Sequence, residues 1–417
     1  MIPALRERFN REYTPEKYRA FLAALDSACG TQVKFRVCET PCFFPRALVA
    51  RLAAAGREMI HQLVEDPAYR RASDAAIPAD FNVPAESPRP LFVQADFGLV
   101  RAANAEIEPR LVEIQGFPSL YGYQTMLLDS YRRVYGLDPS LGGFLDFPDA
   151  DSYLRELRRA IVGAHDPENV VLLEIQPWEQ KTLPDFIATE KLLGVRPVCI
   201  TEVNKEGRRL FYEHAGRRIP IHRIYNRVIV DELMRKDLKL PFSFTDDLDV
   251  EWAGHPNWFF RISKFSIPFL KHPAVPRSWF LDQLAAGHCS PALLEDPVRL
   301  RGETQGTSPW SADLQNYVLK PLYSFAGLGV IVGPTRADLD AIPREKRGEY
   351  LLQERMRFEP VIATPHGPTQ AELRIMFLWV DELKAGPVIV RMGRGKMMGV
   401  DHNRDLEWVG ASAAFLQ

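Results

Sequence analysis

The stretch VQADFGLVRAANAEIEPRLVEIQGFPSLYGYQ, residues 93–124, decides most of what the sequence says about the fold. Two apolar, partly alternating runs flank a polar turn, which is the pattern of a strand pair. The first run contains Asp96, and the second contains Glu113 and Gln115, two residues apart. Side chains two apart in a strand point to the same side, so Glu113 and Gln115 converge, and a hairpin partner can bring Asp96 beside them.

Two carboxylates and an amide oxygen are hard oxygen ligands, suited to Mg2+ that is held together with nucleotide phosphates. The plainer interpretation is a pair of solvated strand faces. That interpretation fits less well, because Glu113 and Gln115 interrupt an otherwise apolar run that leads into a proline turn. The residues alone thus favour a metal site at Asp96, Glu113 and Gln115 but leave both interpretations open.

A second candidate site lies in YVLKPLYSFAGLGVIVGP, residues 317–334. Lys320 ends an apolar strand, and Gly327 and Gly329 lie in the turn before the next strand. A phosphate group needs a cation and closely approaching backbone N–H groups, and glycine permits that approach. A plain hairpin with glycines in its turn explains the same residues, so this pattern alone leaves phosphate binding open.

Two further segments place polar residues in apolar surroundings. In EYLLQERMRF, residues 349–358, a strand ending in Gln353 and Glu354 could offer its backbone edge to an adenine and a carboxylate to a ribose. A solvated edge strand gives the same pattern. In NWFFRISKFSIPFL, residues 257–270, Lys264 lies among aromatic and aliphatic residues, so it must either extend to solvent or meet an anion.

Composition excludes several classes of protein. The chain has 417 residues, of which 46% are hydrophobic and 25% are charged, and its formal net charge is -2. A general nucleic-acid binder would usually be basic. The sequence shows neither a bilayer-spanning apolar run nor the apolar core of a signal peptide, so we expect no membrane contact and a cytoplasmic location. Five scattered cysteines predict no disulfide framework.

The pattern of elements predicts an α+β fold in four regions. Helices over residues 14–25 and 46–66 dominate an N-terminal helical region, residues 1–90, which ends in a surface connection over residues 73–90. The strand pair opens the second region, residues 91–160.

The third region, residues 161–235, contains a strand, a helix ending on Gly194 and a second strand, which is a unit of the parallel α/β type. A hairpin that turns at Ala215 and Gly216 follows. In the fourth region, residues 236–417, short strands at regular spacing after Tyr317 predict an antiparallel sheet.

The order of these motifs resembles the ATP-grasp fold in circularly permuted order. The chain is most similar to the family that includes the synthetase domain of glutathionylspermidine synthetase. The similarity covers about residues 35–400, and region 161–235 is similar to the family's inserted Rossmann-like unit. The order implies a metal-binding half in residues 91–160 and an ATP-binding half in residues 236–417.

The resemblance implies residue roles of three kinds. The metal-binding positions are matched by Asp96, Glu113 and Gln115. The positions that hold or cover the phosphates of ATP are matched by Lys264, Lys320, Gly327, Gly329 and Arg391. The positions against adenine and ribose are matched by Gln353, Glu354 and Met356. Of these, Lys264 and Arg391 are expected to act on the transferring phosphoryl group.

The chain departs from the family's pattern at three positions. Gln115 stands where asparagine is usual, so the amide oxygen is kept on a longer side chain. Gln94 stands where glutathionylspermidine synthetases have an arginine, thought to stabilise the transferring phosphoryl group. Asn226, between Tyr225 and Arg227, replaces the first arginine of a Tyr-Arg-Arg pattern.

The unpermuted ATP-grasp order offers a competing metal set near the C-terminus, made of Glu372, Asp401 and Asn403. We prefer the N-terminal set, because the Rossmann-like region lies between the two halves as the permuted order requires. Residues 398–404 also have the composition of a polar turn.

These expectations together predict an ATP-dependent carboxylate–amine ligase that works through an acyl phosphate. ATP and Mg2+ are its cofactors, and a small-molecule carboxylate and amine are its substrates. No serine or cysteine nucleophile with its base is evident, and the nine histidines are dispersed singly. The alternative is a nucleotide-binding protein with little ligase activity that acts through a partner, as the Gln94 departure suggests.

Overall fold

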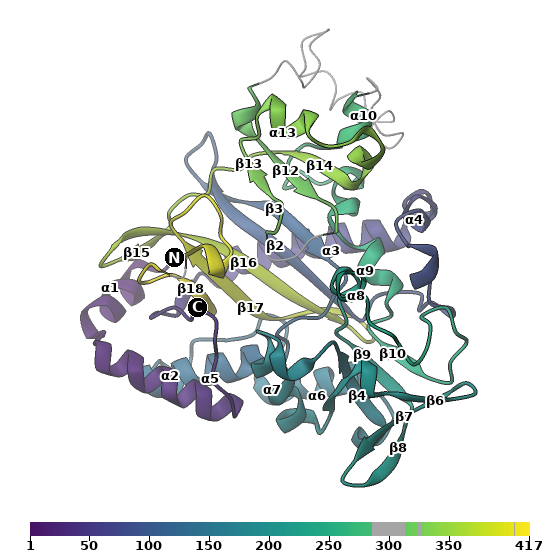
Figure 1. Cartoon of the computed structure of the whole chain (residues 1–417). Helices are drawn as coiled ribbons and strands as arrows, with labels where there is room; N and C mark the ends of the chain where they lie inside the picture. The colour runs from purple at the N-terminus through teal and green to yellow at the C-terminus, as the bar shows by residue number, and fades with distance from the viewer. Residues whose placement is uncertain (286–312, 324–326, 404) are drawn as a thin grey trace.

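The computed structural model describes residues 1–285, 313–323, 327–403 and 405–417. Its largest sheet has the strand order β1-β18-β17-β16-β2-β3, with β15 attached to β16 (Figure 1). β1 joins β18 in parallel, and the other neighbours are antiparallel. The strands of this central sheet are β1 Cys42–Phe44, β2 Phe92–Arg101, β3 Ile107–Gln115, β15 Ile362–Thr364, β16 Gly367–Trp379, β17 Leu383–Gly393 and β18 Gly410–Leu416.

The strand pair expected from the opening stretch is therefore confirmed as β2 and β3. The other neighbour of β2 is β16, which comes from the C-terminal part of the chain. The halves expected over residues 91–160 and 236–417 thus share one sheet, and region 1–90 adds β1 to its far edge.

One face of the central sheet is apolar and packs against α3, Arg46–Glu65. Phe97 of β2 and Leu373 of β16 are among the fully buried residues of this layer. At Gly56 of α3 an added Cβ would come 2.7 Å from the ring of Phe377, so glycine lets the helix approach the strands closely.

The other face of the sheet is divided. At one end Met376, Leu378 and Ile389 belong to a buried cluster with residues of α5, Tyr123–Tyr135, and α6, Ala150–Ile161. Farther along the same strands, polar and charged side chains occupy this face. The division places a polar surface directly beside a helix-covered one.

The N-terminal region is helical as predicted, with α1 Pro3–Glu12, α2 Pro15–Cys29 and α4 Pro67–Asp74 besides α3. The prediction of a surface connection over residues 73–90 was only partly correct. Glu86 accepts hydrogen bonds from Arg261 at 2.9 Å and from Arg70 at 2.6 Å, and it is largely buried. Charge pairing therefore anchors this proline-rich segment to α9, Asn257–Arg261.

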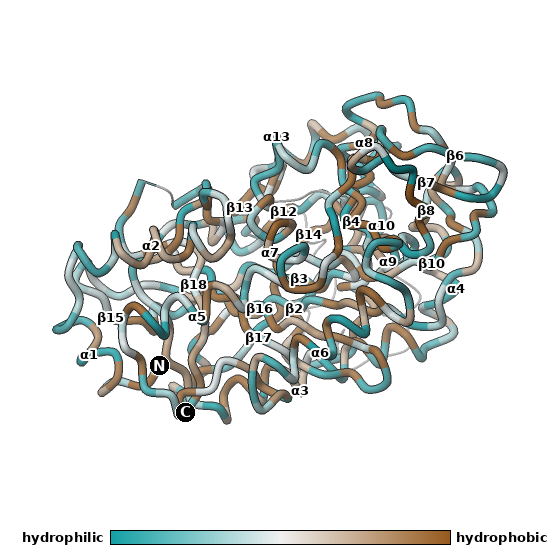
Figure 2. The backbone as a smooth tube through the Cα atoms, turned by 90° about the horizontal axis from the view of Figure 1, so that it is seen from below, coloured by the Kyte–Doolittle hydropathy of each residue, from teal (hydrophilic) through white to brown (hydrophobic). Residues whose placement is uncertain are grey.

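The α/β unit is confirmed as a parallel sheet in the order β10-β9-β4-β5. Its hairpin also turns where expected, with positive φ angles of 50° at Ala215 and 70° at Gly216. Figure 2 shows largely hydrophilic loops beside β6, at one end of the molecule. The elements here are β4 Val170–Glu174, α7 Leu183–Leu193, β5 Arg196–Cys199, β6 Asn204–Glu206, β7 Arg209–His214, β8 Arg217–Ile221, β9 Arg223–Asn226, α8 Val230–Lys236 and β10 Glu251–Ala253.

The prediction of one antiparallel sheet after Tyr317 was wrong, because the strands divide between two sheets. A small antiparallel sheet has the order β11-β14-β12-β13 and lies beyond β3 in Figure 1. β16 and β17 are long and largely apolar, and they pair with each other in the central sheet. The elements of the small lobe are β11 Ser278–Phe280, α10 Leu281–Ala285, β12 Tyr317–Pro321, β13 Ile331–Val332, α13 Arg336–Asp340 and β14 Tyr350–Glu354.

Candidate functional site

The register of the central sheet aligns the charged residues of its polar face. Asp96 lies opposite Glu113 on one side and opposite Arg374 on the other. Glu372, two residues from Arg374, lies opposite Arg391 of β17. Directly opposed residues in an antiparallel sheet project to the same face, so these side chains meet on one surface.

Asp96 is the centre of this polar face and is fully buried. Arg374 binds both of its carboxylate oxygens, with Nε–Oδ1 and Nη2–Oδ2 distances of 2.6 Å. Arg391 donates a second hydrogen bond to Oδ2. Burial alone would raise the pKa of Asp96, but the two guanidinium groups hold it below its ordinary value. Asp96 is therefore an ionised carboxylate between two arginines.

Glu113 and Gln115 lie together, as the strand pattern predicted. Gln115 donates a hydrogen bond to Oε1 of Glu113, and Arg374 Nη2 lies 3.5 Å from the same oxygen. On the other side, Lys264 Nζ lies 3.9 Å from Oε2 of Glu113. Lys264 starts a short 3-10 helix, η5 Lys264–Phe269, and its side chain meets an anion instead of extending to solvent.

Lys320 connects the small sheet to the central one. Its Nζ donates to the Val112 carbonyl at 3.0 Å and to Oε1 of Gln353 at 2.6 Å. Burial lowers the pKa of Lys320 to about 8, although the nearby carboxylate of Glu113 favours the charged form. The structure thus brings Lys320, Lys264 and Glu113 into one region despite their separation in the sequence.

Two buried nitrogen atoms near this region have no hydrogen-bond partner among the described residues. They are Nε2 of Gln353 and Nε of Arg391. A buried donor without a partner costs free energy, and a bound polar ligand would remove that cost. Both atoms belong to residues expected to contact ATP, so the residues present fit a nucleotide.

The remaining nucleotide residues are less closely gathered. Glu354 ends β14 and accepts a 2.7 Å hydrogen bond from Arg277, and Met356 follows beyond the strand, half-buried. Gly327 and Gly329 have positive φ angles of 76° and 73°. The loop that these two glycines close is described except for residues 324–326.

Of the competing metal set, Glu372 and Asn403 have different surroundings. Glu372 lies on the polar face, 2.6 Å from Arg391 Nη2, and burial raises its pKa to about 7. Asn403, by contrast, ties a turn together, accepting from Arg394 N at 3.1 Å and donating to the Met397 carbonyl at 2.9 Å. The side chain of Asp401 is outside the described part of the chain.

Sequence reasoning missed Arg374. Its signal was present, because Glu372 and Arg374 are two apart in the apolar strand β16, the same pattern that singled out Glu113 and Gln115. Counting Arg374, four cations lie together here with three carboxylates, and a fourth carboxylate, Asp231, interacts with Lys264. The other groups are Asp96, Glu113, Glu372, Lys264, Lys320, Arg374 and Arg391. Such a region is suited to a polyanionic ligand.

The donors expected for Mg2+ are present, but they are already engaged. Asp96, Glu113 and Gln115 supply hard oxygen atoms on one face, which fits Mg2+ in chemical type. In the described residues, no group of three or more His, Cys, Asp or Glu side chains could hold a metal ion by itself. A metal at this place would therefore also need the amide oxygen, water or phosphate oxygens.

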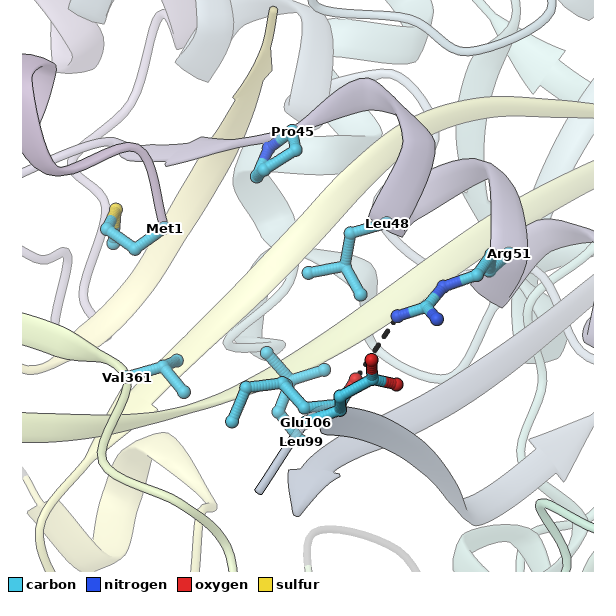
Figure 3. A pocket seen from close by; sticks show the side chains of 8 residues that line it. Met1, Pro45, Leu48, Arg51, Leu99, Glu106 and Val361 are labelled. Atoms are coloured by element: carbon cyan, nitrogen blue, oxygen red, sulfur yellow. Dashed lines mark hydrogen bonds between the residues drawn. The ribbon is translucent and has the colours of Figure 1, made fainter. Parts of the chain in front are cut away.

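A cavity of about 380 Å³ lies on the opposite, apolar side of the central sheet. Leu48, Leu99, Ile107 and Val361 contribute to its lining, and Arg51 at its edge donates to the Ile107 carbonyl at 3.1 Å (Figure 3). Leu99 projects away from the face of Asp96, since the two are an odd number of residues apart in β2. The cavity is therefore separate from the charged site.

Within the described residues, no helix combines the length and apolar character needed to cross a bilayer.

No protein-family model matches this chain, and no curated protein matches its sequence. Its structure is similar to that of a glutathione synthetase-like effector from Globodera pallida, solved in the apo form. The two chains are 13% identical, and the match covers 99% of this chain and 98% of the other with a TM-score of 0.58. At this level of identity the similarity concerns the fold, so the chain has a fold similar to that of a glutathione synthetase-like protein.

Proposed function

We propose that the chain is an ATP-dependent ligase that joins a carboxylate to an amine, built on an ATP-grasp fold in circularly permuted order. The observation that carries the proposal is the meeting of two sheets at one charged place. Lys320 of the small sheet, which also donates to Gln353, donates to the Val112 carbonyl of β3, whose Glu113 belongs to the polar face of the central sheet.

The chain order of these elements supports the permuted arrangement. The acidic strands β2 and β3 come first, the parallel α/β unit follows, and β12, β14, β16 and β17 come last. β16 then closes the sheet against β2. The similarity to a glutathione synthetase-like effector supports a glutathione synthetase-like fold, which is compatible with the proposed ligase.

In this proposal the phosphates of ATP lie against Lys320, Lys264 and Arg391. The backbone around Gly327 and Gly329 covers them, and Gln353, Glu354 and Met356 lie against adenine and ribose. Asp96, Glu113 and Gln115 would hold Mg2+, which, when bound, neutralises negative charge on the phosphate oxygens. Cations held in place before reaction lower the barrier to phosphoryl transfer.

The chemistry proceeds on the substrates. A carboxylate oxygen of the first substrate attacks the γ-phosphorus of ATP, and ADP leaves. The amine nitrogen of the second substrate then attacks the acyl carbon, phosphate leaves, and the nitrogen loses a proton. The chain contributes orientation and positive charge to both steps, and no protein nucleophile forms a covalent intermediate.

The alternative, a nucleotide-binding protein with little turnover, rests on Gln94. In the structure this residue is buried, and its amide donates to the Ser119 carbonyl at 2.6 Å. Its oxygen accepts from Nη1 of Arg374 at 3.0 Å. A guanidinium group therefore lies directly beside the position where the resemblance expects an arginine, which favours the ligase.

ADP formation measured with a panel of amino acids and amines separates the two functions. The ligase requires ADP release to continue over many turnovers only when a suitable carboxylate and amine are both present, and Arg391→Gln to abolish it. Lys346→Ala removes an exposed lysine to which the resemblance assigns no role, and it serves as the control. ATP binding without turnover on any pair would instead support the binding protein.

A further inference from the structure

Arg374 contacts more oxygen atoms than Arg391, the other arginine of the polar face. Its guanidinium contacts both oxygens of Asp96 at 2.6 Å, Oε1 of Glu113 at 3.5 Å and Oε1 of Gln94 at 3.0 Å. Its side chain is only 11% exposed. These contacts fix the guanidinium between the two carboxylates that the resemblance assigns to the metal.

The lone pairs of Asp96 show why this position matters. An ionised carboxylate offers about four lone-pair directions in all. Arg374 uses one on each oxygen, and Arg391 uses a further one on Oδ2. One direction on Oδ1 remains, beside the Arg374 guanidinium, so a divalent metal that binds both oxygens of Asp96 must displace Arg374 or Arg391 from Oδ2.

Charge and burial explain why the arginine is there. Asp96 is 1% exposed and Glu113 is 18% exposed, and a carboxylate with so little access to water is costly without a nearby cation. Arg391 also bonds to Asp96 and Lys264 lies beside Glu113, but Arg374 contacts both carboxylates. A metal that displaced it would leave a largely buried guanidinium without an anion, unless another anion arrived with the metal.

Nucleotide phosphates are suitable anions. An arginine guanidinium binds phosphate oxygens through the same two-pronged geometry that it uses with a carboxylate. A long side chain on the same sheet face can change partners between the carboxylates and a phosphate while its backbone stays in place. The exchange needs no movement of a domain.

We propose that Arg374 is a resident counter-ion of Asp96 and Glu113, which excludes divalent metal from these carboxylates until nucleotide phosphates take over its guanidinium. This inference rests on the proposed function for the identity of the nucleotide. It makes metal and nucleotide binding mutually dependent, since each lowers the cost of binding the other.

The test is a titration with Mn2+, followed by the electron paramagnetic resonance signal of the free ion. The wild-type protein and Arg374→Gln are titrated first without nucleotide and then with ATP. Arg394→Gln is the matched control, because it also removes one arginine. Arg394 bonds to Oγ1 of Thr369 and to the Glu407 carbonyl, and therefore to no carboxylate of the site.

Without nucleotide, Arg374→Gln should bind Mn2+ at least about tenfold more tightly than the wild type, as expected when a competing cation is removed. Arg394→Gln should match the wild type. With ATP the difference between wild type and Arg374→Gln should shrink or reverse, because ATP frees the carboxylates in the wild type. Equal Mn2+ affinities of the wild type and Arg374→Gln without nucleotide would overturn the proposal.

Arg374→Lys provides a second variant if Arg374→Gln folds poorly. It keeps the charge but loses the planar fork, so its Mn2+ affinity without nucleotide should lie between those of wild type and Arg374→Gln. The metal-only comparison does not depend on ATP. A wild type that never binds ATP would therefore reject the proposed function while the metal titration still decides the role of Arg374.

Discussion

Two buried aspartates in this molecule are satisfied in opposite ways. Asp185, in α7, is fully buried and pairs with Arg227 Nη1 at 2.6 Å. The rest of its capacity is filled by backbone N–H groups, each at 3.0 Å, from Leu120, Gly122 and Tyr123. In the described chain, Asp96 instead takes its hydrogen bonds from the side chains of Arg374 and Arg391.

The difference separates a structural ion pair from a functional one. Backbone donors cannot leave without unfolding the loop at Gly122, so Asp185 holds the start of α5 against α7. Side-chain donors can exchange one anion for another at small cost. We infer that buried charge held by the backbone serves the fold, and that buried charge held by arginines alone is available to a ligand.

The largest expected effect breaks the structural pair. Asp185→Asn places an amide beside three backbone donors and leaves Arg227 buried without a full counter-charge. It should lower the free energy of unfolding by about 3–5 kcal/mol, the usual cost of breaking a buried ion pair. Asp96→Asn should cost clearly less, because Arg374 keeps Gln94 and Glu113 as partners. Denaturant unfolding of both variants measures this, and equal losses would contradict the comparison.

The next largest effect is expected on the affinity for ATP. Lys320→Ala should weaken ATP binding by about 1.5–3 kcal/mol, the contribution of a hydrogen bond to a charged group. Isothermal titration calorimetry measures the affinity, and Lys346→Ala is the control. The variant should fold, because burial already disfavours the charged amine of Lys320. Unchanged affinity in a folded Lys320→Ala protein would remove this lysine from the site.

A smaller effect distinguishes the proposed metal ligands from one another. Gln115→Asn keeps an amide oxygen and should hold metal-dependent ATP binding within about tenfold, whereas Gln115→Leu removes the oxygen and should raise the Mg2+ requirement. Glu113→Gln removes a charge and should cost more than Gln115→Asn. Mg2+ titrations against nucleotide binding rank the three variants. If Gln115→Leu behaves like the wild type, Gln115 is not a ligand.

The smallest expected effect is the uptake of part of a proton when ATP binds. The pKa of Lys320 is about 8 in the free protein, and bound phosphates favour the charged amine and raise it. ATP binding at pH 8 should therefore take up about half a proton, and the affinity should fall as the pH rises above 8. Calorimetry in two buffers of different ionisation enthalpy measures the uptake. Lys320→Arg stays charged throughout and should abolish it, whereas undiminished uptake in that variant would assign the proton elsewhere.

The sequence predicted those parts of the site whose signal is local. Glu113 and Lys320 stand out because each is a charged residue within an apolar strand, and the structure places both where the two sheets meet. The β2–β3 pair and the parallel unit could be predicted for the same reason, since hydrophobic period and turn residues lie within short windows.

The parts that sequence reasoning missed depend on pairing between distant strands. Arg374 is 278 residues from Asp96, and only the pairing of β16 with β2 brings them together. The prediction of a single sheet after Tyr317 was wrong for the same reason. Local sequence patterns do not determine which strands pair with each other.

The most direct test of the central claim is a crystal structure of the protein with a non-hydrolysable ATP analogue and Mn2+, whose anomalous signal locates the metal. We predict phosphates between Lys320 and Arg391, and Mn2+ in contact with Glu113 and a phosphate oxygen. Arg374 should then contact a phosphate and have fewer bonds to Asp96. An analogue bound away from the polar face, with Arg374 still hydrogen-bonded to both oxygens of Asp96, would contradict the account.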